Sequence, residues 1–98
     1  MRKYGRTDCN QAEVVRALRK IGASVQDLSP VGNGCPDLLV GWRGRDFLME
    51  VKDGDKPPSE RSLTPAQVAW HESWRGSPVL TVFGPEHAIA MLEAQFVR

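Results

Sequence analysis

The sequence predicts a single α/β domain in which a mixed sheet is flanked by helices. The 98 residues are enough for one domain and not for two. Two strand-like segments, 34–42 and 47–52, are joined by a short turn. A helical segment separates residues 47–52 from a last strand at 79–83, and such a crossover implies parallel pairing with a right-handed connection. The predicted element order is therefore αβββαβα.

The first predicted helix begins at a cap, Asp8 or Asn10, and runs to about Ile21. Its apolar stripe consists of Val14, Val15, Leu18 and Ile21. Gly22 follows as the residue that ends the helix. Residues 1–7 are polar and basic, and we expect them to form a mobile arm. A short strand over 23–28 follows.

The central hairpin has a register that follows from its turn. Arg43 and Gly44 suit a two-residue loop in which Gly44 takes a positive φ. The opposed pairs are then Trp42 with Arg45, Val40 with Phe47, and Asp37 with Glu50. Along the second strand the faces alternate, with Phe47, Met49 and Val51 on one and Leu48, Glu50 and Lys52 on the other.

This register places two carboxylates on one sheet face. Opposed residues have Cβ atoms roughly 4.5–5.5 Å apart, so Asp37 and Glu50 repel each other unless a cation lies between them. Mg²⁺ is the natural candidate, because it takes oxygen ligands and uses one or two carboxylates with substrate phosphate. Lys52 lies on the same face. The alternative is an ordinary hairpin with Glu50 and Lys52 on a solvated surface.

Pro36-Asp37 followed by Glu50-Val51-Lys52 resembles the signature of the PD-(D/E)xK nuclease superfamily. The context of residues 32–38 resembles its viral replication and repair nuclease branch, VRR-NUC, and the resemblance covers roughly Glu13 to Phe83. It implies a restriction-endonuclease-like αβββαβ core, here with an extra C-terminal helix. It also implies an endonuclease that uses Mg²⁺ or Mn²⁺ to hydrolyse DNA phosphodiester bonds.

The resemblance implies a role for each residue of this signature. Asp37 and Glu50 would hold the cation, together with the backbone carbonyl of Val51. Lys52 would orient or activate water and offset charge that develops on the phosphate. The alternative function is a DNA-binding module with the same fold that is inactive or needs a partner protein.

Two further residues have a structural and a catalytic interpretation. Glu13 either serves the dipole of the first turn of its helix or points over the sheet towards the carboxylates, as the resemblance favours. Gln67 completes a capping box that begins at Thr64, and the resemblance also places it at the site. It shares a helix face with Trp70, His71 and Trp74. For His71 we favour a packing or surface role over that of a ligand or base.

Contacts to DNA are expected from basic and polar residues outside the signature. The candidates are Lys3, Arg6, Arg16, Lys20, Asn33, Lys56 and Arg61. The net charge is only +1, so the alternative of a solvated surface stays open. No base-reading motif is present, so recognition should rest on backbone charge and DNA shape. Asp53 and Asp55 more readily form a solvated loop than extra ligands.

A chain this small gains stability by dimerising, so we expect a homodimer. The two sites of a dimer match the symmetry of a four-way (Holliday) junction, the branched DNA expected as substrate. Trp42, Ile89 and Leu92 are candidates for the apolar contact, and each is equally a candidate for the core.

Cys9 and Cys35 form neither a metal-ligand spacing nor a disulfide framework, and Cys35 suits packing better than catalysis. No segment resembles a signal peptide or a membrane span, so we expect an intracellular, cytoplasmic protein without a small-molecule cofactor.

Overall fold

The computed structural model describes the backbone of residues 3–97 and the side chains of residues 10–97. Three helices and four strands follow one another as α1 (Lys3–Lys20), β1 (Ser24–Asp27), β2 (Leu38–Trp42), β3 (Arg45–Val51), α2 (Pro65–Ser73), β4 (Leu80–Val82) and α3 (Pro85–Ala94). Short 3₁₀ turns cover Ser29–Val31 and Pro58–Glu60. The strands form one sheet in the order β1-β2-β3-β4, in which only the β3–β4 pair is parallel. The predicted mixed α/β class is confirmed.

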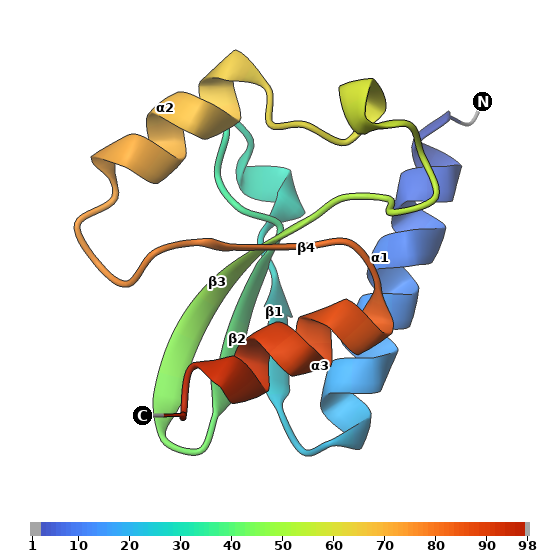
Figure 1. Ribbon diagram of the computed structural model, residues 1–98. Coiled ribbons are helices and arrows are strands. Elements are labelled where there is room, and N and C mark those ends of the chain that lie inside the picture. Colours follow the sequence, from blue (N-terminus) through green and yellow to red (C-terminus); the bar gives the residue numbers. More distant parts are fainter. Residues whose placement is uncertain (1–2, 98) are drawn as a thin grey trace.

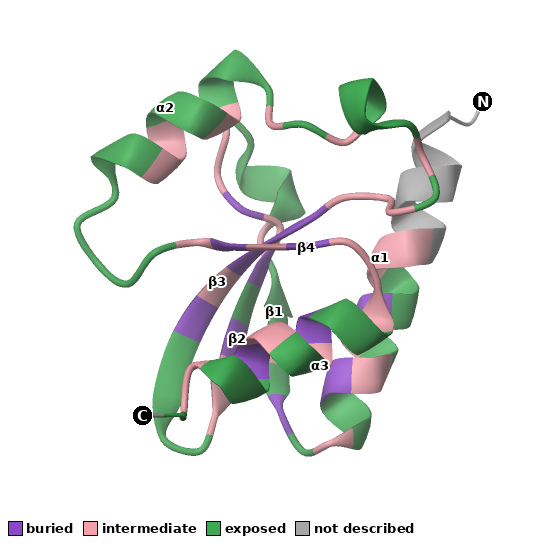
Figure 2. Ribbon diagram, viewed as in Figure 1, coloured by how far each residue is buried: buried purple, intermediate pink, exposed green. Residues whose placement is uncertain are grey.

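The two sides of the sheet are covered very differently. Helices α1 and α3 pack together on one side, and α2 lies apart from both of them (Figure 1). The core between the sheet and the α1–α3 pair comprises Val14, Leu18, Ala23, Leu38, Val40, Phe47, Met49, Val51, Leu80, Val82, Ala88 and Leu92. Figure 2 shows buried residues on β2, β3, β4, α1 and α3 but none on α2. Helix α2 is therefore held by a few specific contacts and not by a core of its own.

The hairpin has the predicted register. Arg43 and Gly44 have φ angles of 52° and 80°, as a two-residue turn with two left-handed positions requires. Trp42 pairs with Arg45, and the ladder continues to the Leu38–Met49 pair. Asp37 and Glu50 occupy the next position, so their side chains emerge on the same face.

Three predicted details of the helices are wrong. Helix α1 begins at Lys3, so Asp8 and Asn10 lie inside the helix and cap nothing, and residues 3–7 of the expected arm are helical. Lys and Arg are good helix formers and no proline stands before Asp8, so nothing stops the helix from extending. Helix α2 ends at Ser73 and not near Gly76, because Trp74 is already extended, with φ −70° and ψ 127°. A Cβ at Gly76 would lie 2.6 Å from Trp74 Nε1, so this glycine lets the chain pass the indole ring.

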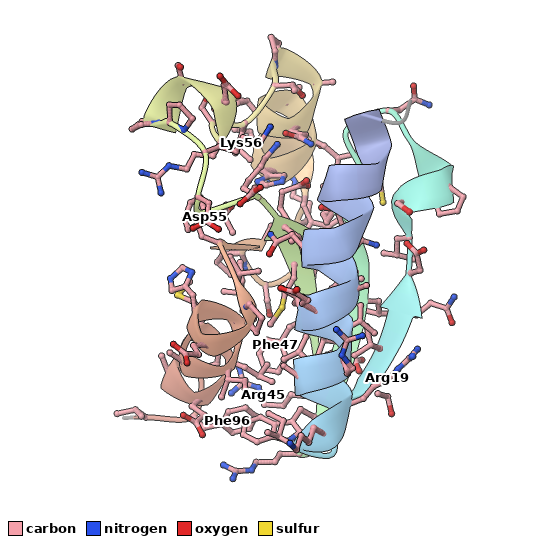
Figure 3. All side chains as sticks on the ribbon, turned by 90° about the vertical axis from the view of Figure 1, so that its right-hand side faces the viewer. Arg19, Arg45, Phe47, Asp55, Lys56 and Phe96 are labelled. Carbon is pink, nitrogen blue, oxygen red and sulfur yellow. The ribbon has the colours of Figure 1, made fainter. Side chains whose placement is uncertain are left out.

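The apolar residues proposed for a dimer contact are used within the chain. Leu92 is fully buried and Ile89 packs against the core. Trp42 meets Phe96 edge-on, with ring centroids 5.4 Å apart, and the Arg43 guanidinium lies 4.0 Å from the Trp42 ring centroid. Figure 3 shows this end of the molecule, where Arg45 and Phe96 lie together below Phe47. Leu92 is therefore a core residue, whereas Trp42 and Ile89 are half-buried.

Within the described part of the chain, no helix is long and apolar enough to span a bilayer.

Candidate active site

Asp37 is anchored at the mouth of β2 by backbone groups on both sides. Its carbonyl accepts a hydrogen bond from Leu28 N at 2.7 Å, which closes the loop between β1 and β2. Its side-chain Oδ2 accepts from Val51 N at 2.8 Å on the neighbouring strand. The carboxylate is therefore held beside the end of β3, next to the Val51 backbone.

Glu50 is the one charged residue in the buried set of described side chains, with 1% of its surface exposed. Burial raises its pKa from 4.5 to about 8, with further increases from its hydrogen bond to Asp37 and from the Asp37 charge; the Lys52 ammonium acts in the opposite direction. The charge of Asp37 therefore disfavours the charged form of Glu50, as expected from the hairpin register.

Gln67 connects Glu50 to Lys52. Its Oε1 accepts from Lys52 Nζ at 2.8 Å and from Thr64 N at 2.9 Å, and its Nε2 donates to Glu50 Oε2 at 3.0 Å. Two donors at the oxygen determine which way the amide faces. The Thr64 hydroxyl in turn accepts from Gln67 N at 3.2 Å, which completes the capping box. Both predicted arrangements of Gln67 therefore occur together: the residue that caps α2 also aligns two residues of the site.

His71 also faces Glu50, one turn further along α2. Its Nε2 lies 3.8 Å from Glu50 Oε1. Burial and the Lys52 charge both lower the pKa of His71, so its ring is neutral at pH 7. Of the packing or surface role that we favoured for this residue, the surface alternative does not fit this position, whereas the packing alternative does. The i, i+4 spacing from Gln67 was the signal for this inward position.

The residues present fit a divalent cation of the oxygen-binding class. Among the described side chains, no group of three or more His, Cys, Asp and Glu surrounds a common point. Two adjacent carboxylates are nevertheless the number that Mg²⁺ commonly takes from a protein when substrate phosphate completes its shell. Glu50 Oε1 is buried and has no hydrogen-bond partner among the described residues, so the carboxylate keeps lone pairs that a cation could take as ligands. Asp37 and Glu50 would hold the ion.

Comparison with known proteins agrees with this geometry. A solved structure described as a VRR_NUC domain superposes on the chain with a TM-score of 0.67 and 30% sequence identity, over 91% of this chain and 96% of that one. The chain belongs to the VRR_NUC family. No family sequence model matches the chain, and a search of curated proteins finds no significant match. The resemblance expected from the Pro-Asp and Glu-Val-Lys signature is confirmed, and with it a nuclease-like domain.

Helix α2 is positioned over the VRR_NUC site by a close backbone approach. Gly34 has φ 85°, and a Cβ built on it would lie 2.3 Å from Ala66 O in the first turn of α2. No side chain larger than hydrogen fits between this loop and the helix. The loop that delivers Asp37 therefore also sets the distance of Gln67 from Glu50.

We expect Gly34→Ala to displace α2 and to break the contact between Gln67 and Glu50. The matched control is Gly44→Ala, because Gly44 has a similar φ of 80° in the hairpin turn but no atom within 4 Å of a built Cβ. The control should cost about 1–2 kcal/mol of unfolding free energy, the penalty of a left-handed alanine. Chemical denaturation should show a larger loss for Gly34→Ala. Equal losses would mean that the approach of loop and helix is not tight.

The structure gives Glu13 no contact with the described residues of the VRR_NUC site, and its role there stays a prediction. Glu13 is exposed on α1, and no hydrogen bond or ion pair links it to another described residue. Its alternative role in a first turn is wrong, because the helix begins ten residues earlier, at Lys3. The α1 residue that reaches the site is Asn10, whose Nδ2 donates to Lys52 O at 2.9 Å. Sequence reasoning assigned Asn10 to a cap, although its position one turn before buried Val14 indicated the inward face.

The loop after Lys52 is organised by its own side chains. Asp53 Oδ1 accepts from Asp55 N at 2.9 Å, so this carboxylate closes a turn as the solvated-loop interpretation predicts. Lys56 forms an ion pair with Glu60 at 3.7 Å, and Arg61 lies over the Phe83 ring at 5.5 Å. Figure 3 shows Lys56 and Asp55 at the end of the molecule opposite Arg45 and Phe96.

The candidate DNA-binding residues whose side chains the structure describes lie on several separate segments. The side chains of Lys3 and Arg6 lie outside the described set. Arg16 and Lys20 are exposed on α1, and at 1.5 Å per residue they stand about 9 Å and 15 Å along the helix from Asn10. Asn33 is exposed in the loop before Asp37, with a left-handed φ of 55°.

Cys35 is half-buried beside the site. Burial raises the pKa of its thiol most, and the charges of Glu50 and Asp37 raise it further, as suits an unreactive packing residue.

Proposed function

We propose that this VRR_NUC domain is an endonuclease that uses Mg²⁺ or Mn²⁺ to hydrolyse DNA phosphodiester bonds. The observation that supports it best is the chain of contacts from Glu50 through Gln67 to Lys52, with Asp37 beside Glu50. A buried carboxylate with a raised pKa, linked through Gln67 to the Lys52 ammonium, is typical of a functional site and is not needed to stabilise a hairpin.

The residues of the site divide the work between them. Asp37 and Glu50 hold the cation, with the Val51 carbonyl beside them. A bound divalent ion lowers the pKa of water and neutralises charge on the phosphate. The Lys52 ammonium, held by Gln67 Oε1, orients the attacking water and offsets charge on the phosphate oxygens. The hydrogen bond from Asn10 to the Lys52 carbonyl keeps the Lys52 backbone in place from the opposite side.

Plasmid nicking tests this function. The wild-type chain should nick supercoiled DNA with Mg²⁺ or Mn²⁺ and should stop when EDTA is added. Glu50→Gln should be inactive under all conditions. DNA binding without nicking by the wild type would favour an inactive module, and nicking only with an added cellular factor would favour a partner-dependent subunit.

We propose contacts to the DNA backbone for basic and polar residues on the segments around the site. Lys56 and Arg61 lie on the loop after Lys52, Asn33 lies before Asp37, and Arg16 and Lys20 extend along α1. Such contacts to phosphate should weaken binding uniformly across sequences when they are removed.

We also propose that the domain works as a homodimer on branched DNA, with a four-way junction as the preferred substrate. The apolar surface that remains exposed on the α2 side includes Leu39 and Trp74, 38% and 46% exposed. These two residues border a cavity of about 460 Å³ between α2 and the sheet. Burying this surface against a second copy offsets the limited core of a small chain.

Light scattering at micromolar concentration should give about twice the chain mass of 10.9 kDa. Trp74→Glu should shift the protein to a monomer, whereas Val97→Glu, at an exposed apolar residue in the chain terminus, should not. A monomeric wild type would contradict the dimer. Equal cleavage of linear duplex and four-way junction would contradict the substrate preference.

A further inference from the structure

Two polar atoms in the site face each other without being satisfied. Glu50 Oε1 and His71 Nε2 are both buried and neither has a hydrogen-bond partner among the described residues. They lie 3.8 Å apart, and the Glu50 side chain is 2% exposed and that of His71 14%. A buried polar atom that is left unpaired destabilises the folded chain, because it has lost its hydrogen bonds to water without replacement. Because one of these atoms can donate and the other can accept, a small movement would let them form a hydrogen bond with each other.

The other described neighbours of His71 offer its Nε2 no hydrogen-bond acceptor. Trp70 presents its ring edge-on, with centroids 6.5 Å apart, and offers only packing. Lys52 lies near enough for its charge to lower the pKa of His71, but it donates its hydrogen bond to Gln67. Glu50 is the acceptor that remains within reach of His71.

Each of the two carboxylate oxygens of Glu50 faces one polar side chain of α2. Gln67 Nε2 already donates to Glu50 Oε2 at 3.0 Å. His71 follows Gln67 by four residues on the same face of α2 and confronts the other oxygen. The gap exceeds a hydrogen bond by less than 1 Å, and hydrogen bonds in active sites are often long until substrate is bound.

We propose that His71 is a positioning residue for Glu50, whose Nε2–H holds Oε1 while Gln67 holds Oε2, so that α2 orients the carboxylate towards the cation. This inference rests on the proposed function, since it gives Glu50 a cation to face. Residues that orient a metal ligand typically change metal affinity by about 10–100-fold when they are replaced.

Calorimetric titration with Mn²⁺ tests the proposal without any need for cleavage. His71→Leu fills the same space but has no donor, and it should weaken Mn²⁺ binding by about 10–100-fold. His71→Gln keeps a donor and should restore most of the affinity. The chain has one other histidine, His87, which accepts from Phe83 N and stacks on the Phe83 ring, so His87→Gln should behave as wild type.

Equal Mn²⁺ affinity in wild type and His71→Leu would overturn the proposal, and so would a loss in His71→Gln as large as in His71→Leu. Should His71→Leu fail to fold, nitrogen-15 NMR of the wild type with Mg²⁺ decides, because the proposal requires the Nε2–H tautomer of His71. The Nδ1–H tautomer, or nitrogen coupling to bound Mn²⁺ in electron paramagnetic resonance, would overturn it. A wild type that binds Mn²⁺ in this pattern but does not nick plasmid would refute the proposed function and leave this inference standing.

Discussion

Replacing Lys52 by methionine is expected to slow DNA cleavage by about 10²–10³-fold, the typical cost of removing one donor that stabilises a transition state. Methionine keeps the length of the side chain and its packing but loses the ammonium group that Gln67 Oε1 holds at 2.8 Å. Because we propose that Lys52 acts on water and phosphate and not on the cation, metal affinity should change far less than turnover. Single-turnover cleavage at saturating Mg²⁺ gives the measurement.

The control for this variant is Lys56→Met in the neighbouring loop. Lys56 pairs with Glu60 at 3.7 Å and has no contact with Gln67 or Glu50 among the described residues. Its loss should alter binding at most and leave turnover at saturating DNA unchanged. Wild-type turnover in Lys52→Met would remove Lys52 from the mechanism.

Replacing Glu50 by glutamine is expected to abolish Mg²⁺ binding and to make the folded chain more stable at pH 8. The pKa of Glu50 is raised from 4.5 to about 8 by burial, by the hydrogen bond to Asp37 and by the Asp37 charge. The folded state therefore binds this proton more tightly than the unfolded state. That contribution to stability is complete below pH 4.5 and is lost as the pH rises towards 8.

The wild type should consequently lose stability relative to Glu50→Gln between pH 5 and pH 8, by an amount on the order of a few kcal/mol, since each pKa unit corresponds to about 1.36 kcal/mol. Added Mg²⁺ should recover this loss in the wild type at pH 8 and have no effect on the variant. Thermal unfolding at both pH values with and without Mg²⁺ provides the comparison. If the stabilities of the two proteins changed in parallel with pH, the pKa of Glu50 would not be raised in the folded chain.

The hairpin and its carboxylate pair were predictable because local rules determine them. A two-residue turn at Arg43 and Gly44 sets the register, and side chains alternate strictly along a strand, so Asp37 and Glu50 must share a face. The start of α2 was predictable for the same reason, because Thr64 and Gln67 have the residue types and spacing of a capping box. The fold class followed from these elements and from the crossover to β4.

The rest depended on contacts between distant segments. The start of α1 could not be placed from a capping residue, because the residues before Asp8 also favour a helix and α1 extends back to Lys3. Asn10 lies one turn before Glu13 on α1, and its contact with the Lys52 carbonyl depends on how the helix packs against β3. The approach of Gly34 to Ala66 joins residues 32 positions apart and leaves no local pattern. His71 was visible as a member of a helix face, but what that face covers emerged only in the fold.

Anomalous diffraction from crystals grown with Mn²⁺ tests the central claim most directly, since it locates the cation. The account predicts a peak within ligand distance of the Asp37 and Glu50 carboxylates and beside the Val51 carbonyl, and no such peak in crystals of Asp37→Asn. A Mn²⁺ peak elsewhere in the wild type, or the same peak in Asp37→Asn, would contradict it.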